Sequence, residues 1–287
     1  MKNLASPKVI KEILEESGFK FSKSLGQNFL IDENVLDKMI AGSGINENTN
    51  VIEIGPGFGT LTQRLCQNAK KVVAIEIDKT AVPILSNNLA EFDNLKIIND
   101  DVLKCDLNKI ISEEFGNESV RIVANLPYYI TTPIIMHILE SKIKTESLCI
   151  MIQKEVAERI AAKPSTKDYG ALTVSVNYYA EPRMICHVPP SSFIPAPKVS
   201  SSVISLDIRQ NPPVDVKNEK GYFKIVKAAF GQRRKTLLNA LSNSPAIPMA
   251  KDGVMQALKD IGIDEKRRGE TLGLQEFADI SNKIFEC

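Results

Sequence analysis

The chain has 287 residues, of which 43% are hydrophobic and 25% are charged, so its composition is that of a globular protein of about two domains. Its 36 Lys and Arg residues and 35 Asp and Glu residues give a formal net charge of +1, which excludes a uniformly cationic protein that binds any polyanion. The chain contains no run of about 18 apolar residues that would predict a membrane-spanning helix, and its charged, helix-like start is not typical of a signal peptide. Its widely spaced cysteines are expected to be reduced thiols, as in a cytoplasmic protein.

Short apolar runs alternate with helical patterns up to Glu155. An amphipathic helix is predicted over 7–17, a polar loop over 20–29, and a helix that Asp32 caps and that ends near Ala41. The apolar runs predict strands over 50–54, 72–77, 95–98, 120–124 and 148–153. Further helices are predicted over 60–66, 80–89 and 134–139. This order predicts an α/β fold whose parallel sheet is covered on both faces.

The pattern changes after Glu155. Alternating residues predict strands over 173–179 and 203–208, and a proline-rich stretch without regular structure lies between them. Beyond the sequence Asn211-Pro212-Pro213, helices are predicted over 222–241, 251–261 and 274–284. We therefore expect a larger domain over 1–209 and a smaller helical domain over 210–287.

A glycine loop, Gly-Pro-Gly-Phe-Gly-Thr over 55–60, connects the first apolar strand to a helix. In this context Gly55 and Gly57 let the backbone approach a bound ligand closely. A dinucleotide fingerprint requires Gly or Ala at the position of Thr60, so the loop disfavours a nicotinamide cofactor and suits a nucleoside without a pyrophosphate. The alternative interpretation is an ordinary tight turn.

Acidic side chains end the next two strands. Glu76 lies 21 residues after Gly55, where a carboxylate can accept hydrogen bonds from both ribose hydroxyl groups. Asp78 competes for this role, but we expect it to cap the following helix. Asp100 and Asp101 follow the third strand, where a carboxylate can accept a hydrogen bond from an adenine amino group; otherwise they are helix caps. Together these features favour an adenosine site.

Asn125-Leu126-Pro127-Tyr128 follows the fourth strand. An aromatic amino group is a poor nucleophile because its lone pair is delocalised, and the Asn125 amide and the Leu126 carbonyl can accept its protons and stabilise the charge that develops. Pro127 makes the turn rigid, and Tyr128 offers a stacking face for an extruded base. The alternative is a plain turn in which Tyr128 packs.

The chain offers few residues for other chemistry. Neither of its two histidines, His137 and His187, lies in a triad or metal motif, and we expect no metal. Its five cysteines are widely spaced, which predicts neither a disulfide framework nor a zinc site.

The glycine loop, Glu76, Asp101 and residues 125–128 resemble the motifs of class I S-adenosylmethionine-dependent methyltransferases that act on an exocyclic amine. Two further segments, Ser-Leu-Gly-Gln-Asn-Phe-Leu over 24–30 and Phe-Ile-Pro-Ala-Pro-Lys-Val-Ser-Ser over 193–201, are similar to signatures of the rRNA adenine dimethyltransferase family. The similarity extends from about Lys20 to the carboxyl end. It implies a Rossmann-like α/β fold with a mostly parallel seven-stranded sheet and a small all-α carboxyl-terminal domain.

The resemblance also implies residue roles. The cofactor S-adenosyl-L-methionine would be bound by Gln27, Asn28, Leu30, Gly55, Gly57, Glu76, Asp101 and Asn125. The first three would close over it, the glycines would meet it with their backbone, and the carboxylates would hold its ribose and its adenine amino group. Asn125 would also contact the target amine, and Tyr128 and Phe193 would sandwich the target adenine. Without the resemblance, Phe193 is better interpreted as a core anchor.

The implied reaction is the dimethylation of two adjacent adenosines in a hairpin loop near the 3′ end of small-subunit rRNA, within an immature small ribosomal subunit. Direct transfer from a sulfonium needs positioning and electrostatics rather than a metal or a nucleophile. The alternatives are a large-subunit rRNA dimethyltransferase that confers macrolide resistance, a ribosome-assembly factor without catalysis, and a nicotinamide oxidoreductase. Nothing predicts an obligate dimer, so we expect a monomer.

The net charge conceals an uneven distribution. From Asp207 onward the chain has 14 basic and 11 acidic residues, and the remainder has 22 and 24. Between Lys217 and Lys235, seven basic residues and one acidic residue give a charge of +6 over 19 residues. This stretch predicts a surface that contacts RNA phosphates, with Arg234 two helical turns beyond its lysines. The residues expected to bind RNA are Lys224, Lys227, Arg233, Arg234 and Lys235. The alternative is a solvated helix face.

Overall fold

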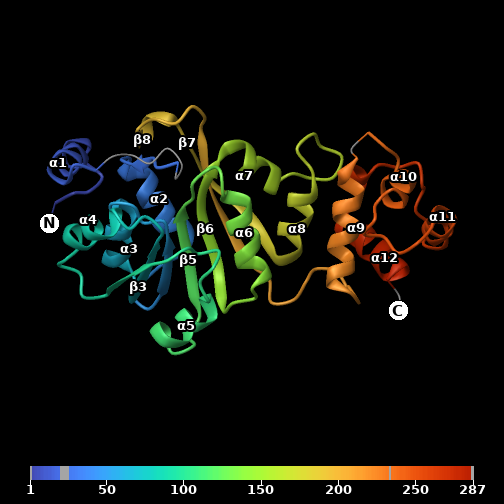
Figure 1. Ribbon diagram of the computed structural model, residues 1–287, viewed down its shortest axis with the longest axis horizontal. Coiled ribbons are helices and arrows are strands. Elements are labelled where there is room, and N and C mark those ends of the chain that lie inside the picture. Colours follow the sequence, from blue (N-terminus) through green and yellow to red (C-terminus); the bar gives the residue numbers. More distant parts are fainter. Residues whose placement is uncertain (1, 20–25, 233, 286–287) are drawn as a thin grey trace. The chain divides into compact units, whose positions relative to one another are not determined.

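The computed structural model describes residues 2–19, 26–232 and 234–285. The chain divides into two units (Figure 1). Unit 1 comprises Met1–Ala157 and Pro182–Ile208, and unit 2 comprises Glu158–Glu181 and Arg209–Cys287.

The predicted domains differ from these units in one segment. The break after Ile208 lies beside the predicted boundary, but residues 158–181, which the sequence pattern assigns to the larger domain, belong to unit 2. The reason is burial: Tyr169, Val174 and Tyr178 are part of the hydrophobic core of unit 2.

Unit 1 is built on a mixed but mostly parallel sheet. Its strands are β2 (Asn50–Ile54), β3 (Lys71–Glu76), β4 (Leu95–Asn99), β5 (Val120–Asn125), β6 (Thr145–Gln153), β7 (Ala180–Val188) and β9 (Ser201–Ile208). Within the described residues they form a seven-stranded sheet in the order β4-β3-β2-β5-β6-β9-β7. Strands β2 to β6 pair in parallel, and β9 is antiparallel to β6. The predicted seven-stranded α/β architecture is confirmed.

Helices follow most of these strands along the chain. They are α1 (Pro7–Ser17), α2 (Glu33–Ser43), α3 (Thr60–Asn68), α4 (Ala81–Asn88), α5 (Leu107–Phe115), α6 (Thr131–Glu140) and α7 (Lys154–Ile160). Asp32 caps α2 as predicted, since its side chain accepts a hydrogen bond from the Val35 N–H. Helix α5 and strand β7 were not predicted, although Asp106 caps α5 in the same way.

Both faces of the sheet are covered. Val51 and Val123 pack against α2 and α3 in one hydrophobic cluster, whereas their buried neighbours Ile52 and Ile122 point to the opposite face. Such strands, apolar on both faces, are typical of parallel sheets. No helix within the described part of the chain is long and apolar enough to span a membrane.

A second, two-stranded sheet joins distant segments of unit 1. It consists of β1 (Phe29–Leu30) and β8 (Phe193–Ile194), which pair antiparallel with Leu30 opposite Phe193. The short 3-10 helix η2 (Pro190–Ser192) precedes β8. The predicted irregular, proline-rich segment therefore contains one turn of helix and a short strand.

The carboxyl ends of the parallel strands meet at one edge of the sheet. Ile54 at the end of β2 is opposite Ile75 of β3 and Ala124 of β5, and Glu76 is opposite Asn99 of β4. Residues that follow these strands are therefore brought side by side, which is where open α/β sheets bind ligands.

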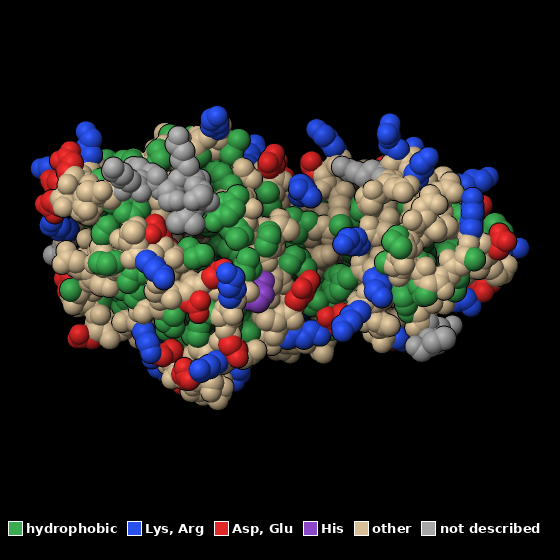
Figure 2. Space-filling model, viewed as in Figure 1, with side chains coloured by type: hydrophobic (Ala, Val, Ile, Leu, Met, Phe, Trp, Pro, Cys, Tyr) green, Lys and Arg blue, Asp and Glu red, His purple; other side chains and the backbone are tan. Residues whose placement is uncertain are grey.

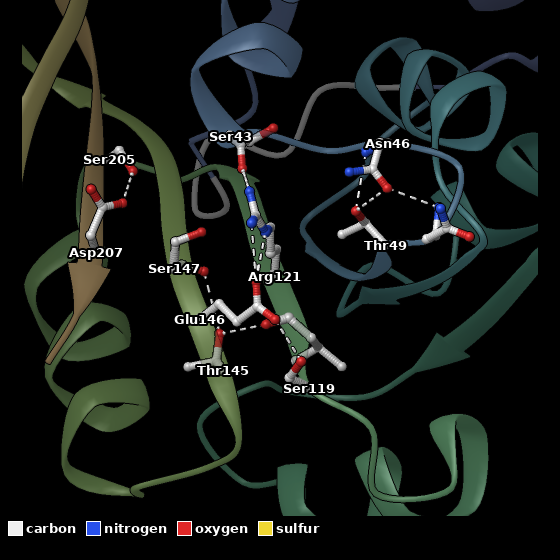
Figure 3. Close-up of polar contacts among 12 residues, drawn as sticks. Ser43, Asn46, Thr49, Ser119, Arg121, Thr145, Glu146, Ser147, Ser205 and Asp207 are labelled. Carbon is white, nitrogen blue, oxygen red and sulfur yellow. Dashed lines mark hydrogen bonds and ion pairs between the residues drawn. The ribbon is translucent and has the colours of Figure 1, made fainter. Parts of the chain in front are cut away.

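The opposite edge carries polar contacts that hold the fold together (Figure 3). Arg121 at the start of β5 forms an ion pair with Glu146 of β6, with Nη2 and Oε2 3.0 Å apart, and also donates a hydrogen bond to the Ser43 carbonyl at the end of α2. Ser119 donates a hydrogen bond to the other oxygen of Glu146 at 2.6 Å. Gly44 follows α2 with φ +65°, and a Cβ at this position would collide with the Arg121 guanidinium.

Unit 2 is helical. Its elements are α8 (Ala171–Tyr179), α9 (Glu219–Gly231), α10 (Leu237–Ser242), α11 (Lys251–Asp260), the 3-10 helix η3 (Gly269–Thr271) and α12 (Leu274–Ile284). Figure 1 shows α9, α10, α11 and α12 gathered together, and Tyr222 and Phe277 lie fully buried among them.

Two predictions in this region were wrong. Residues 173–179 form a helix rather than a strand, because Val174 and Tyr178, one helical turn apart, are buried together. The helix predicted over 222–241 is two helices, since α9 ends at Gly231 and Thr236 caps a new helix by accepting a hydrogen bond from Asn239.

Candidate active site

An open pocket lies at the carboxyl edge of the sheet in unit 1. Five stretches of chain line it: residues 26–30, the strand and loop residues Glu53 and 55–57, the helix start Thr60 and Leu61, the pair Glu76 and Ile77, and residues 125–129. The predicted residues Gln27, Asn28, Leu30, Gly55, Gly57, Glu76, Asn125, Leu126, Pro127 and Tyr128 are thus brought together. Ser24 and Leu25 of the predicted signature lie outside the described residues.

Residues 26–30 lie against the glycine loop. The rings of Phe29 and Phe58 stack with their centroids 4.1 Å apart. Gly57 has φ +58°, and a Cβ added there would lie 2.8 Å from the Phe29 ring. Glycine is therefore required both by the backbone conformation and by the approach of Phe29. This packing holds the segment over one side of the pocket.

Glu76 is a buried carboxylate that backbone groups orient. Its Oε2 accepts a hydrogen bond from the Gly57 N–H at 3.0 Å, and its Oε1 accepts one from the Asp78 N–H at 2.8 Å. Burial raises the pKa of Glu76, whereas these two hydrogen bonds lower it. Each oxygen keeps a further lone pair, so the carboxylate can accept protons from two vicinal hydroxyl groups, as expected for a ribose site.

Asp78 supports the turn beside Glu76. It accepts hydrogen bonds from the Thr80 N–H at 2.9 Å and from Gln27 Nε2 at 2.7 Å, and its pKa is lowered. The N-cap position of α4 is occupied by Thr80 and not by Asp78 as expected. Asp78 stabilises the turn just before the helix instead. The contact with Gln27 links the 26–30 segment to the end of β3.

Glu53 is a pocket residue that sequence reasoning missed. It lies within the apolar strand β2 with only 1% of its surface exposed, and its Oε2 has no hydrogen-bond partner among the described residues. Burial raises the pKa of Glu53 to about 8; the Thr62 side chain lowers it and the negative charge of Glu76 raises it further. A buried carboxyl oxygen without a partner costs free energy that a cationic ligand would recover. A single charged residue inside an apolar strand is the signal that could have revealed it.

Asn125 ends β5 with its amide oriented by the 26–30 segment. Its Nδ2 donates a hydrogen bond to the main-chain carbonyl of Asn28 at 3.2 Å. Leu126, the next residue, also lines the pocket. The next carbonyl, that of Pro127, accepts hydrogen bonds from the Ile130 N–H at 3.3 Å and from Thr131 Oγ1 at 3.0 Å. The turn after the strand is therefore fixed at both ends.

Tyr128 is half-buried at the pocket. Its hydroxyl group lies 2.7 Å from Oγ of Ser201, the first residue of β9, which is fully buried. Burial raises the pKa of the tyrosine, so its hydroxyl stays protonated at neutral pH. The hydrogen bond fixes the far end of the ring, and the ring can then present one face to a planar ligand.

Two predicted site residues do not line the pocket in the described structure. Phe193 is 3% exposed and packs in the cluster between the sheet and α2, which agrees with the alternative interpretation as a core anchor. Asp101 accepts a hydrogen bond from the Leu103 N–H at 3.1 Å and lies 3.5 Å from Lys104, and it closes the turn after β4. Contacts of these residues with adenine rings stay predictions.

Comparison with known proteins decides the family. The family model described as ribosomal RNA adenine dimethylase matches residues 18–286. The chain belongs to the ribosomal RNA adenine dimethylase family. The match covers nearly the whole chain, so both units belong to the family's pattern.

Curated relatives of this dimethylase match over their full length. The chain is 52% identical to the protein named ribosomal RNA small subunit methyltransferase A of Alkaliphilus oremlandii over 284 residues, which are 99% of each chain. It is also 52% identical to the protein of the same name from Geobacillus thermodenitrificans, over 99% of this chain and 97% of that one.

Solved structures share the fold of the dimethylase. A dimethyladenosine transferase from Plasmodium falciparum superposes with a TM-score of 0.74 at 24% identity, covering 88% of this chain and 95% of that one. The 23S rRNA methyltransferase ErmE gives a TM-score of 0.67 at 24% identity, covering 90% and 100%. The predicted methyltransferase fold is confirmed.

The pocket of the dimethylase fits S-adenosyl-L-methionine, the methyl donor of this family. Glu76 offers its carboxylate to the ribose, and the positive-φ glycines Gly55 and Gly57 leave room for the cofactor to approach the backbone. The unpartnered oxygen of Glu53 is suited to the ammonium group of the methionine moiety. The described residues contain no cluster of metal-ligating side chains.

Basic side chains of the dimethylase stand out from unit 2 (Figure 2). Lys224 and Lys227 are exposed on one face of α9, and Lys224 Nζ lies 5.7 Å from the centroid of the Phe285 ring. Arg234 and Lys235 are also exposed, but they lie in the turn after α9 rather than two turns further along it, because the helix ends at Gly231. Arg233 lies outside the described residues.

Proposed function

We propose that this chain dimethylates the N6 amino groups of two adjacent adenosines in a hairpin loop near the 3′ end of small-subunit rRNA, with S-adenosyl-L-methionine as donor. Relatives that are 52% identical over their full length are named small subunit methyltransferases, which supports the small-subunit substrate. The likeness to ErmE, at 24% identity, concerns the fold alone, so the large-subunit alternative has less support.

The orientation of the Asn125 amide is the main structural support for this proposal. Because its Nδ2 donates to the Asn28 carbonyl, its Oδ1 is left to accept a proton of the target amine. The Leu126 carbonyl beside it accepts the second proton. Two acceptors draw the amine lone pair out of conjugation with the purine ring and stabilise the positive charge that develops on nitrogen during transfer.

The remaining residues position the two reactants. When bound, the cofactor supplies a methyl group that its sulfonium has already activated. Tyr128, held by Ser201, offers its ring to the target base, and Glu76 and Glu53 hold the ribose and ammonium ends of the donor. After the first transfer the amine has one proton left, which either Asn125 or the Leu126 carbonyl can accept, so the same site can act twice.

The proposal includes the cellular setting. We expect the protein in the cytoplasm, where small subunits mature, and the immature subunit is the expected partner. We expect the protein to act as a monomer. A role as an assembly factor is compatible with catalysis, because basic residues of unit 2 can contact rRNA without taking part in methyl transfer.

Substitution of Asn125 separates catalysis from binding. Asn125→Ala removes one of the two amine acceptors and is expected to lower the methylation rate by about 100-fold or more, as for loss of a transition-state hydrogen-bond partner. The variant should still bind small subunits. Asn68→Ala, which changes an exposed residue at the end of α3, is the matched control and should methylate normally. Undiminished methylation by Asn125→Ala would contradict the proposed role.

A further inference from the structure

Tyr129 is an exposed aromatic residue at the pocket for which the reaction described above has no use. With 57% of its surface exposed, it is the most exposed large hydrophobic side chain in the described part of the chain, and it lines the pocket immediately after Tyr128. An aromatic ring left in water at the entrance of a ligand site favours a role in contacting the ligand.

The position of this ring is well defined. The turn that carries it is closed by the hydrogen bonds from Ile130 and Thr131 to the Pro127 carbonyl. One edge of the ring lies against Gly26, since a Cβ at Gly26 would be 3.4 Å from Cδ1 of Tyr129. The backbone is therefore held while most of the ring remains open to solvent.

We propose that Tyr129 is a stacking platform for the nucleobase next to the target adenosine. This inference rests on the proposed function. A target base that enters the pocket beside Asn125 and Tyr128 leaves its stack, and its neighbour in the strand then lies at the entrance with one face uncovered. Exposed aromatic rings are the usual partners of such unstacked bases in RNA recognition.

The proposed substrate would use the contact with Tyr129 in both methylation events. Two adjacent adenosines are modified, so each in turn is the neighbour of the other. A ring recognises the face of a base rather than its amino group, so Tyr129 can hold an unmodified adenine as well as a dimethylated one. The platform would thus keep the RNA in place while the second nucleotide exchanges into the pocket.

The chemistry at Tyr129 favours a base over a phosphate. The pocket lining includes the Glu76 carboxylate and contains no Lys or Arg among the described residues. An anionic group would be repelled there, whereas a neutral purine would bury the exposed ring face.

The test uses a small-subunit hairpin RNA with 2-aminopurine at the nucleotide next to the target adenosine. Wild type should quench the 2-aminopurine fluorescence on binding, because the base stacks on the ring. Tyr129→Phe should quench as wild type does, and Tyr129→Ala should lose the quenching and bind the hairpin about tenfold more weakly. Met184→Ala removes another exposed apolar side chain, on β7 and outside the pocket lining, and should behave as wild type.

Binding of S-adenosylhomocysteine, measured by calorimetry, shows whether the Tyr129→Ala site is intact; its affinity should equal that of wild type. Full quenching and full affinity in Tyr129→Ala would overturn the inference, and so would a loss of S-adenosylhomocysteine affinity equal to the loss of RNA affinity. A wild-type protein that methylates no small-subunit rRNA would instead overturn the proposed function itself.

Discussion

Most polar side chains to which we assign a role in the pocket are oriented by a hydrogen bond from or to a neighbouring group. Asn125 is oriented by a main-chain carbonyl of the 26–30 segment, and Tyr128 is held by a buried serine of β9. Glu53 is the exception, since one of its oxygens has no partner in the described residues. These differences predict different consequences of substitution.

Glu53 is expected to make cofactor binding depend on pH. The pKa of Glu53 is raised to about 8, so the carboxyl group is largely protonated at pH 7 without ligand. A cationic ammonium group favours the ionised form, and binding at pH 7 should therefore release a proton. Affinity should rise with pH and level off above about 8. Calorimetry of S-adenosylhomocysteine binding in buffers of different ionisation enthalpy measures the released proton.

Glu53→Gln provides the contrast. The substitution should weaken S-adenosylhomocysteine binding by roughly tenfold to 100-fold, which is the cost of losing a hydrogen bond to a charged group. It should also abolish the proton release. In the unliganded protein, stability should fall as pH rises from the ordinary carboxyl pKa of 4.5 to about 8, because over this range the Glu53 carboxyl group ionises in the unfolded chain but keeps its proton in the folded one. Equal proton release by wild type and Glu53→Gln would show that another group titrates.

Ser201→Ala tests whether a buried hydroxyl group positions Tyr128. Loss of the 2.7 Å contact frees the tyrosine ring, and we expect kcat to fall about fivefold to tenfold with unchanged cofactor affinity, the effect of one lost neutral hydrogen bond. Ser205→Ala is the matched control, because it lies on the same strand at the opposite edge, where Ser205 donates to Asp207 (Figure 3). If both variants methylate at the wild-type rate, Ser201 has no positioning role.

At the scale of elements, the two edges of the sheet in unit 1 have different roles, one in ligand binding and the other in stability. The carboxyl edge holds the pocket, and the amino edge holds contacts such as the one between Arg121 and Glu146. The short β1–β8 pair belongs to the first edge, because it ties the 26–30 segment to residues more than 160 positions later in the chain. Changes at the second edge should therefore affect stability and not the site.

Arg121→Ala is the corresponding prediction. Arg121 links β5, β6 and the end of α2, and its side chain is 28% exposed, so solvent screens part of its ion pair. We expect the free energy of unfolding to fall by about 1–2 kcal/mol. Urea denaturation measures this change, and calorimetry should show unchanged affinity for S-adenosylhomocysteine. A large loss of that affinity would mean that the two edges are coupled.

Strand ends could be predicted from the sequence, and buried polar residues could not. The strand over 50–54 and the loop after it follow from an apolar run and glycines, and the sequence therefore brings Gly55, Glu76 and Asn125 to one edge. Glu53 was missed although it is a charged residue inside an apolar strand, because the strand pattern alone does not show which buried side chains line the pocket. Phe193 was assigned to the adenine site by resemblance, whereas burial decides its present position in the core.

Helix α8 shows why local patterns fail in unit 2. Its β-branched and aromatic residues alternate as in a strand. Long-range burial and side-chain contacts override this propensity: Thr173 Oγ1 donates to the Arg159 carbonyl, and Asn177 donates to the Ile160 carbonyl at 3.1 Å. The alternating sequence pattern predicts none of these hydrogen-bond partners.

At the scale of the whole molecule, a net charge of +1 is the sum of unlike parts. Carboxylates of unit 1 line the pocket proposed to bind a cationic, ribose-containing ligand, and exposed lysines gather on α9 of unit 2. We expect such a distribution to give affinity for one structured RNA without general affinity for polyanions. It predicts that RNA binding and cofactor binding can be changed separately.

The double substitution Lys224→Ala and Lys227→Ala should weaken binding to small subunits and reduce the salt dependence of binding by about two phosphate contacts. S-adenosylhomocysteine affinity should not change. The control is Lys8→Ala with Lys11→Ala, which removes two exposed lysines with the same spacing from α1. Filter binding over a range of salt concentrations gives both slopes. Equal slopes for the two double variants would exclude α9 as an RNA surface.

The central claim is tested most directly by mass mapping of methylated adenines after incubation of purified immature small subunits, or of large subunits, with the protein and S-adenosyl-L-methionine. The account predicts N6,N6-dimethyladenosine at two adjacent positions in a hairpin loop near the 3′ end of the small-subunit rRNA, absent with Asn125→Ala. Methylation of large-subunit rRNA alone, or of neither RNA, would contradict it.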